Sequence, residues 1–194
     1  MGRIKSALEI AMERTESVKG DRASIDLFEA KQRGKKLAND FLSGEIQYLE
    51  DEIKKAPKEQ RSSLKQGMFD VLISQITLPN SLEDEKRLET LGRGLQAIIA
   101  NSKFSATYRQ FLLGIGQFLS EVVKYDELIQ RQYAPKLRQK EEELSRRLGQ
   151  TVQIDPFQDP EFIAFYNKNM TVLRDNYQTM VNQVQEQARE YFKA

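Results

Sequence analysis

The chain has 194 residues, 39% hydrophobic and 30% charged, and its 30 Lys and Arg residues nearly balance 29 Asp and Glu residues. A formal net charge of +1 argues against a dedicated nucleic-acid binder, which usually carries a basic excess. The absence of Cys and His excludes a disulfide framework, a thiolate nucleophile and a zinc site built from those side chains.

Two helices are expected before Pro57. Residues 3–18 form the first, and Gly20 with Asp21 is expected to end it. Its shared face carries Ile4, Leu8, Ala11 and Thr15. The second is expected over 24–56, although Gly34 and Gly44 each weaken it by about 1 kcal/mol relative to Ala. Its clearest apolar stretch alternates spacings of four and three through Leu42, Ile46, Leu49, Ile53 and Ala56.

Two shorter helices are predicted next, over 58–77 and 81–100. The sequence Leu78-Pro79 separates them, because proline cannot continue a helix. Asn80, followed three residues later by Glu83, predicts an N-cap pair for the second of these helices.

A long helical pattern covers 104–148. Pro135 lies inside it and is expected to kink or briefly break the helix, since it lacks a backbone donor. Gly149 is expected to cap its C-terminus. Residues 150–159 form the clearest non-helical segment, and Asp159-Pro160 predicts the N-cap and first position of a final helix.

The final helix, 160–193, carries the most regular pattern in the chain. Apolar residues alternate spacings of three and four, a pattern that predicts a flat seam for another helix and that only Gln187 interrupts. The stripe consists of Ile163, Tyr166, Met170, Leu173, Tyr177, Met180, Val184 and Tyr191.

These patterns predict an all-α fold, an elongated antiparallel helical bundle with long coiled-coil-like helices. We expect one elongated helical domain over 1–194, with a possible subdivision into a helical part, 1–100, and a long helical hairpin, 101–194.

No residue is assigned a catalytic, cofactor-binding or metal-ligating role, and no cofactor is expected. The Met and Tyr stripe of the final helix is interpreted as packing core in preference to a ligand lining. Gly92-Arg93-Gly94 and Gly114-Ile115-Gly116 follow no strand, so we interpret them as sites of close helix approach and not as nucleotide loops. The sequence from Asp155 to Phe162 is interpreted as a turn whose two phenylalanines plug the end of the bundle.

Clusters of charged residues suggest an alternative function, the binding of an anionic surface. Lys31, Arg33, Lys35 and Lys36 could meet an anionic surface, but on a helix they spread over more than half of the circumference, which favours a solvated face. Glu142 with Arg146, and Glu143 with Arg147, have the spacing of helical ion pairs. The outer face of the final helix is rich in Asn and Gln, and it can be interpreted either as a hydrogen-bonded interface or as a solvated surface.

The opening Ile4-Lys5-Ser6-Ala7-Leu8-Glu9, then Glu13-Arg14-Thr15, resembles the start of an uncharacterised bacterial protein family. The sequence from Pro135 to Leu144 and the pair Asp155-Pro156 are similar to later segments of the same family. The resemblance runs nearly the full length and implies a bacterial, cytoplasmic, mainly helical protein. It transfers no catalytic or binding residue.

The function favoured by the sequence is a non-catalytic helical interaction or scaffold protein that self-associates, with a dimer favoured and a further protein partner unidentified. The alternative is a module that binds an anionic surface, either a membrane or a nucleic acid, although the sequence disfavours both as partners. No small-molecule substrate is evident. No segment approaches the roughly 20 apolar residues that span a bilayer. Acidic residues interrupt the apolar residues of the N-terminal segment, which therefore lacks the continuous apolar stretch of a signal peptide. We expect a cytoplasmic location.

The case for a dimer rests on helix lengths. The helices over 58–77 and 81–100 are too short to cover the long stripes, so a contiguous apolar surface is expected to stay open for a second copy. The alternative is that the two long helices pair within one chain, as a hairpin around 149–160. The aromatic residues at issue are Tyr108, Phe111, Phe118, Tyr125, Tyr177 and Tyr191.

Overall fold

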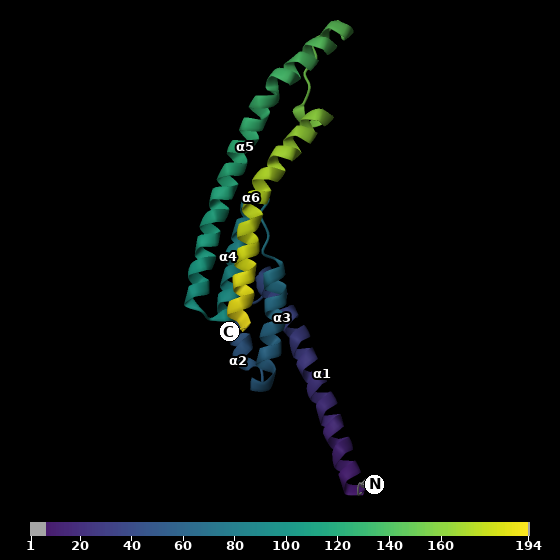
Figure 1. The fold of residues 1–194 in the computed structure, drawn as a ribbon, viewed down its shortest axis with the longest axis vertical. Helices are drawn as coiled ribbons and strands as arrows, with labels where there is room; N and C mark the ends of the chain where they lie inside the picture. The colour runs from purple at the N-terminus through teal and green to yellow at the C-terminus, as the bar shows by residue number, and fades with distance from the viewer. Residues whose placement is uncertain (1–6, 194) are drawn as a thin grey trace, which may run out of the picture. The chain divides into compact units, whose positions relative to one another are not determined.

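The fold is an all-α antiparallel bundle, as the sequence predicts. The computed structural model describes residues 7–193, with side chains over 23–81 and 84–193. Within residues 7–193 it contains helices and turns and no β-strand (Figure 1). The helices are α1 (Ala7–Ser43), α2 (Leu49–Lys55), α3 (Arg61–Ser74), α4 (Leu82–Ile99), α5 (Ser102–Leu148) and α6 (Pro160–Lys193), with 3₁₀ turns η1 (Lys58–Gln60) and η2 (Pro156–Gln158). None of the helices in this part of the chain combines the length and hydrophobicity that crossing a bilayer requires.

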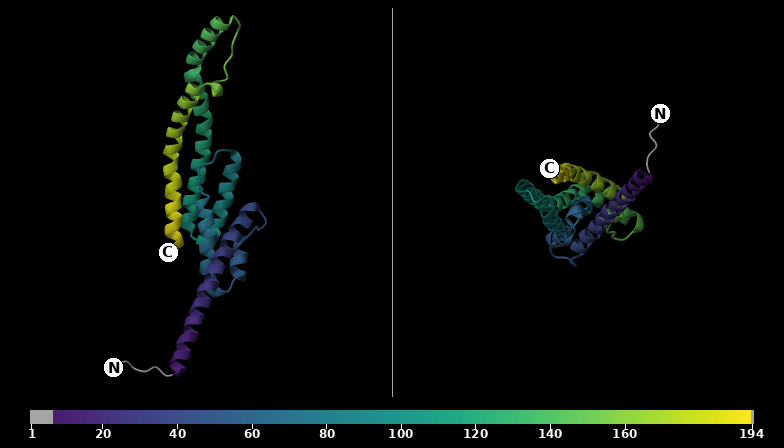
Figure 2. Two further views of the ribbon diagram at one scale, coloured as in Figure 1. Left: turned by 90° about the vertical axis from the view of Figure 1, so that its right-hand side faces the viewer. Right: turned by 90° about the horizontal axis from the view of Figure 1, so that it is seen from below.

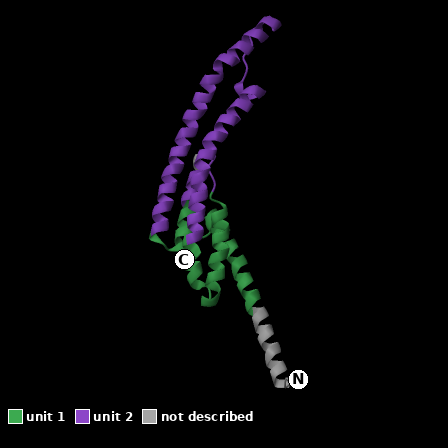
Figure 3. Cartoon of the chain, viewed as in Figure 1, with its two compact units in different colours: residues 1–76, 90–102, 191–194 green, residues 77–89, 103–190 purple. Residues whose placement is uncertain are grey.

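The chain divides into two compact units (Figure 3). Unit 1 comprises the residues up to Ile76, Thr90–Ser102 and the C-terminal end from Tyr191. Unit 2 comprises Thr77–Glu89 and Lys103–Glu190. Helices α4 and α6 each contribute residues to both units.

The limits of the first helices differ from those expected. The predicted stop at Gly20 is wrong, because α1 continues through it to Ser43; a glycine costs a helix only about 1 kcal/mol. The chain turns at Gly44, whose φ of +86° lies in the left-handed region. The helix expected over 24–56 is therefore divided into α1 and the short α2. The face predicted for Ile4, Leu8, Ala11 and Thr15 lies outside the residues whose side chains are described.

Helices α3 and α4 confirm the two helices predicted around the break at Leu78-Pro79. The N-cap of α4 lies one residue later than expected. Ser81 Oγ accepts a hydrogen bond from the Asp84 N–H at 3.3 Å, and the Asp84 carboxylate accepts one from the Asn80 N–H at 2.9 Å. The first bond satisfies a donor at the helix end, and the second returns to the residue before the N-cap, an arrangement that resembles a capping box. The side chain of Glu83, the expected partner, lies outside the described ones.

In unit 1, a close contact joins α1 to α3. A Cβ on Gly34 would overlap the carbonyl of Leu64, and a Cβ on Gly67 would overlap the carbonyl of Lys31. The two backbones can approach this closely only because both positions lack a side chain. The buried apolar residues of this unit include Ala30, Ala38, Phe41, Leu49, Ile53, Leu64, Met68, Phe69, Leu72, Leu91 and Leu95.

In unit 2, α5 and α6 lie side by side as a hairpin (Figures 1 and 2). The rings of Phe118 and Tyr177 lie 5.1 Å apart, and those of Tyr133 and Phe162 lie 5.2 Å apart. A Cβ on Gly114 would overlap the sulfur of a methionine, Met180, on α6. Gly114 therefore permits a close helix approach, as its sequence context predicted.

The hairpin turn follows the sequence closely. Gly149 adopts φ of +67° at the end of α5, and its N–H donates to the Ser145 carbonyl at 2.9 Å. Asp159 caps α6, since its Oδ1 accepts from the Glu161 N–H at 3.1 Å. A break at Pro135 is not observed, because α5 is continuous through that residue (Figure 1).

The predicted stripe of α6 lies mainly on the packed side. Ile163 is the exception: it is 39% exposed, and its neighbour Phe162, 1% exposed, occupies the buried position. Gln187 remains half-buried on the stripe, and its Oε1 is buried with no partner among the described residues. The remaining members are buried or half-buried: Tyr166, Met170, Leu173, Tyr177, Met180, Val184 and Tyr191.

The aromatic surface expected to stay open is covered within the chain. Tyr108, Phe111 and Phe118 are at most 3% exposed, while the other expected aromatic residues are half-buried. The pairing of α5 with α6 covers most of this surface, and the Tyr108 hydroxyl also donates to the Leu88 carbonyl of α4 at 2.8 Å. The structure thus has the intramolecular hairpin.

Candidate functional site

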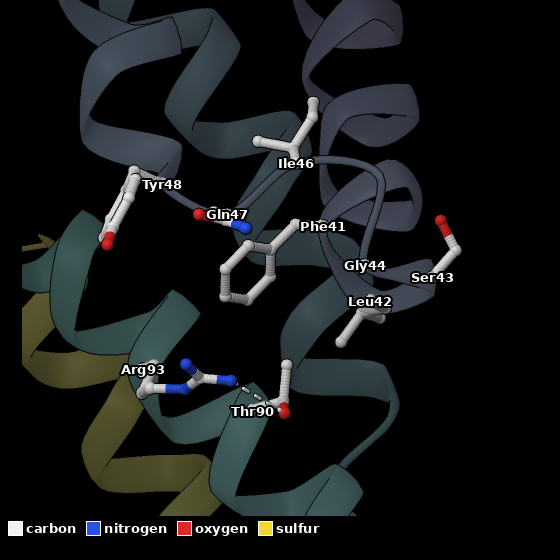
Figure 4. A pocket seen from close by; sticks show the side chains of 9 residues that line it. All are labelled: Phe41, Leu42, Ser43, Gly44, Ile46, Gln47, Tyr48, Thr90 and Arg93. Atoms are coloured by element: carbon white, nitrogen blue, oxygen red, sulfur yellow. Dashed lines mark hydrogen bonds between the residues drawn. The ribbon is translucent and has the colours of Figure 1, made fainter.

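A surface groove of unit 1 lies between the loop after α1 and one face of α4 (Figure 4). Two adjoining cavities of about 350 and 310 Å³ form it, and both are lined by Phe41, Gln47, Tyr48 and Arg93. These volumes lie at the lower end of the range for small-molecule sites.

The loop that forms one wall has a defined backbone. Gly44 reverses the chain in the left-handed region, and the Ile46 N–H returns to the Asp40 carbonyl at 3.1 Å. Tyr48 is then extended, with φ −133° and ψ 111°, immediately before α2 begins at the fully buried Leu49. The backbone is thereby fixed on both sides of Tyr48, whose side chain remains 64% exposed.

The other wall is one face of α4. Thr90, Arg93, Gln96 and Ala97 recur at spacings that place them on one side of a helix. The neighbouring Gly94 brings this helix close to the groove floor, because a Cβ there would lie 2.9 Å from the Phe41 ring.

Arg93 supplies the charge of the groove. Of the residues whose side chains are described, it is the only charged one that lines the larger cavity, while Glu50 lines the smaller one. Its Nη2 donates to Thr90 Oγ1 at 3.2 Å, and it forms no ion pair with a described residue. Figure 4 shows the Arg93 guanidinium and Thr90 on the α4 side, with Phe41 and Tyr48 across the opening.

A polar cluster of unit 2 joins the two helices of the hairpin near the turn. Lys140 Nζ lies 2.7 Å from a carboxylate oxygen of Asp159 and 2.7 Å from one of Glu161. Tyr133 donates its hydroxyl to Asp159 at 3.0 Å, and Lys136 Nζ lies 2.9 Å from Glu161. Asp159 is only 6% exposed, so its charge depends on these partners.

The partners hold each group of this cluster in one protonation state. The bond from Lys140 lowers the pKa of Asp159 from its ordinary 3.8, and Lys140 and then Lys136 lower the pKa of Glu161 from 4.5. Asp159 in turn raises the pKa of Lys140, and burial, followed by the Asp159 bond, raises the pKa of Tyr133. None of these groups therefore changes its charge near pH 7, so the arrangement is suited to holding the turn and not to proton transfer.

The charged clusters singled out in the sequence have structural partners. Lys31 Nζ lies 2.8 Å from the Asp70 carboxylate, between α1 and α3. Despite the opposing effect of burial, the bonds from Lys31 and Gln66 lower the pKa of Asp70. Arg146 and Glu142 form the predicted helical ion pair at 3.5 Å, whereas no Glu143–Arg147 pair is present among the described side chains.

The predicted turn at 155–162 is confirmed in its main features. Asp155 Oδ1 accepts from the Phe157 N–H at 3.0 Å, and Phe162 is buried. Phe157 remains 50% exposed, although its ring lies 5.2 Å from that of Phe162. Within the described residues no cluster of three Asp or Glu side chains could hold a metal ion.

Sequence reasoning missed both the groove and the polar cluster. The groove combines residues far apart in the chain, such as Tyr48 and Arg93, and the sequence contained no periodic signal linking them. The cluster had a partial signal: Tyr133, Lys136 and Lys140 recur at spacings of three and four, opposite the predicted cap Asp159.

Comparison with known proteins places the chain in a family without an assigned role. No curated protein sequence and no solved structure shows significant similarity to it. The model of one family of unknown function, DUF6657, matches residues 50–190, which include the α4 wall of the groove, the polar cluster and the α5–α6 hairpin. Since that match covers most of the sequence, the chain belongs to the DUF6657 family of unknown function.

Proposed function

We propose that this protein is a non-catalytic helical interaction or scaffold protein that self-associates as a dimer in the bacterial cytoplasm. The observation that carries the proposal is a run of exposed residues on α1. Every residue from 23 to 29 is exposed, and the run includes Ile25 (56%), Leu27 (40%) and Phe28 (62%).

The exposed run lies away from the packed face of α1. Within residues 23–43, where the side chains of α1 are described, that face includes Ala30, Gly34, Ala38 and Phe41. At 3.6 residues per turn, Phe28 lies about 200° around the helix from Ala30. Ile25 and Phe28, three residues apart, therefore form a second apolar side that unit 1 does not cover.

Such a helix segment gains stability from a partner. A helix without tertiary packing is marginal in water, and large apolar side chains on it add a cost of exposure. A second copy bound about a two-fold axis covers the same residues on both chains, which is the commonest arrangement of soluble oligomers. The surface differs from the aromatic stripes first expected to stay open, because those stripes pair with each other.

Sedimentation equilibrium of the full chain at tens of micromolar tests the proposal. We expect a dimer mass for the native sequence and a monomer mass for the double variant Ile25→Asp/Phe28→Asp. A matched control is Leu113→Asp, which changes an equally apolar and even more exposed residue on α5 and should leave the dimer intact. A monomer mass for the native chain would contradict self-association.

The alternative, binding to an anionic surface through Lys31, Arg33, Lys35 and Lys36, has weaker support. Lys31 is engaged by Asp70, and Gly34 at the centre of the cluster is packed against α3. Arg33 and Lys36 remain the exposed cations. Salt-sensitive retention on heparin or on anionic liposomes, abolished by Arg33→Gln/Lys36→Gln, would favour this alternative over self-association.

A further inference from the structure

We infer that the groove between Tyr48 and Arg93 is a binding site for an organic carboxylate that carries a flat apolar group, such as an aromatic ring. Arg93 would hold the carboxylate, and Tyr48 with Phe41 would contact the ring. This site is separate from the α1 surface proposed for self-association, so either can fail without the other.

Arg93 has the free donors that such a ligand requires. Its hydrogen bond to the Thr90 hydroxyl uses one N–H of the five that a guanidinium carries. Arg61, by contrast, is more fully engaged, since it donates to the carbonyls of Ala56 and Lys54. The planar fork of an arginine matches the two oxygens of a carboxylate, so two parallel hydrogen bonds can form.

The charge of the groove favours a monoanion. Among the described side chains, Arg93 is the only cation lining either cavity, and the one acidic residue, Glu50, lines only the smaller cavity. A single carboxylate balances a single guanidinium. A phosphate dianion would leave a net negative charge beside Glu50, because Arg93 is the single described cation that could balance it.

The aromatic walls favour a flat apolar group next to that charge. Phe41, 6% exposed, forms the floor, and Tyr48 is held over the opening by the backbone of the loop. Aromatic pairs add about 0.5–1.5 kcal/mol beyond the burial of their area. Gln47 lines both cavities and lies beside Phe41 (Figure 4), so its amide can hydrogen-bond a polar edge of the ligand.

The test is a titration of the ¹⁵N-labelled full chain followed by NMR, including the Arg Nε–Hε signals. The probes are benzoate, acetate, inorganic phosphate, N-acetylphenylalanine and N-acetylphenylalanine amide. We expect saturable shifts of Arg93 and of the 44–48 loop with benzoate and N-acetylphenylalanine, and at least tenfold weaker binding of acetate, phosphate and the amide.

Variants separate the two contacts. Arg93→Gln should weaken the binding of both carboxylates at least tenfold, and Tyr48→Ala should weaken them several-fold while leaving acetate unchanged. The control Arg109→Gln removes an exposed arginine from α5 and should change nothing. Circular dichroism verifies that each variant keeps its helix content.

The remaining outcomes each decide a point. Tighter binding of N-acetylphenylalanine than of benzoate supports the site with a peptide C-terminus as its source, and the reverse order supports it with a small acid as the source. The inference is overturned if no probe gives saturable shifts, if Arg93→Gln binds as the native chain does, or if phosphate or the amide binds as tightly as the carboxylates.

Discussion

Gly34 on α1 and Gly67 on α3 occupy reciprocal places in one helix contact. Each lies against a backbone carbonyl of the opposite helix, that of Leu64 and that of Lys31 respectively. Contacts of this kind place Cα hydrogens near carbonyl oxygens, an interaction that contributes about 0.5–1 kcal/mol each. The pair therefore sets the distance between α1 and α3, on which the surrounding core of unit 1 depends.

Replacing either glycine by alanine should destabilise the protein. The added Cβ would overlap a backbone atom, which cannot rotate away as a side chain can, so the helices must separate. We expect Gly34→Ala and Gly67→Ala each to lower the free energy of unfolding by about 1–3 kcal/mol or more, measured by urea denaturation.

Gly116→Ala is the matched control. Among the described atoms its Cβ would meet only Glu85 Oε1, at an ordinary contact distance of 3.7 Å, and the position lies inside α5. Alanine is the better helix residue by about 1 kcal/mol, so this variant should be neutral or stabilised. Equal losses at all three glycines would show that the α1–α3 contact has no special role.

The register of α6 can be tested with two acidic substitutions. Leu173 is 5% exposed, so Leu173→Asp buries an unpaired charge and should cost about 3–5 kcal/mol. Gln183 is exposed, and Gln183→Asp should change stability by less than about 0.5 kcal/mol. Thermal melts followed by circular dichroism compare the two, and equal shifts would contradict the register.

The polar cluster at the hairpin turn should make stability depend on pH. The pKa values of Asp159 and Glu161 are lowered in the folded state. The ionised carboxylates therefore stabilise the fold fully above pH 3.8 and pH 4.5, their ordinary pKa values, and this stabilisation is lost as the pH falls through the lowered values. The pKa of Lys140 is raised in the folded state. The charged ammonium therefore stabilises the fold fully below pH 10.5, and this stabilisation is lost as the pH rises through the raised value.

Asp159→Asn tests this dependence, because asparagine keeps an N-cap oxygen but removes the charge. Its stability deficit relative to the native chain should be largest between about pH 5 and 10 and should shrink below about pH 4. Urea melts across this range measure it. Asp175→Asn, at an exposed position of α6, provides a control whose deficit should be small at every pH.

The protein is expected to purify without a stoichiometric divalent metal or nucleotide. The chain has no His or Cys and no phosphate-binding loop, and the polar cluster satisfies its own charges. Native mass spectrometry should give the mass of the polypeptide alone. A bound Zn²⁺, Fe or ATP at one equivalent would reopen an enzymatic role.

Local signals in the sequence predicted the helices and several of their ends. Gly149 and Asp159 mark the hairpin turn because each acts through its own backbone or through a neighbour two to four residues away. Glycine was ambiguous elsewhere: Gly20 does not end α1 whereas Gly44 does, and the difference depends on the conformation that each adopts.

Features that depend on tertiary packing could not be predicted from local sequence signals. Ile163 and Phe162 are adjacent apolar residues, and packing against α5, where Phe162 clusters with Ile129 and Tyr133, decides that Phe162 is the buried one. Likewise, no pattern in one segment could predict that Arg93 and Tyr48 share a groove, since the Gly44 turn and the approach of α4 to Phe41 bring them together.

Pro135 has a mechanical consequence for α5. The helix continues through it, but proline has no N–H to donate to the carbonyl of Arg131. One backbone hydrogen bond of the helix is therefore missing, on an exposed side. Bending is easiest where such a hydrogen bond is missing. The part of the hairpin beyond Pro135 is therefore expected to fluctuate as a unit whose amplitude is limited by the link from Lys140 to Asp159, and amide hydrogens on the two sides of residue 135 should exchange at different rates.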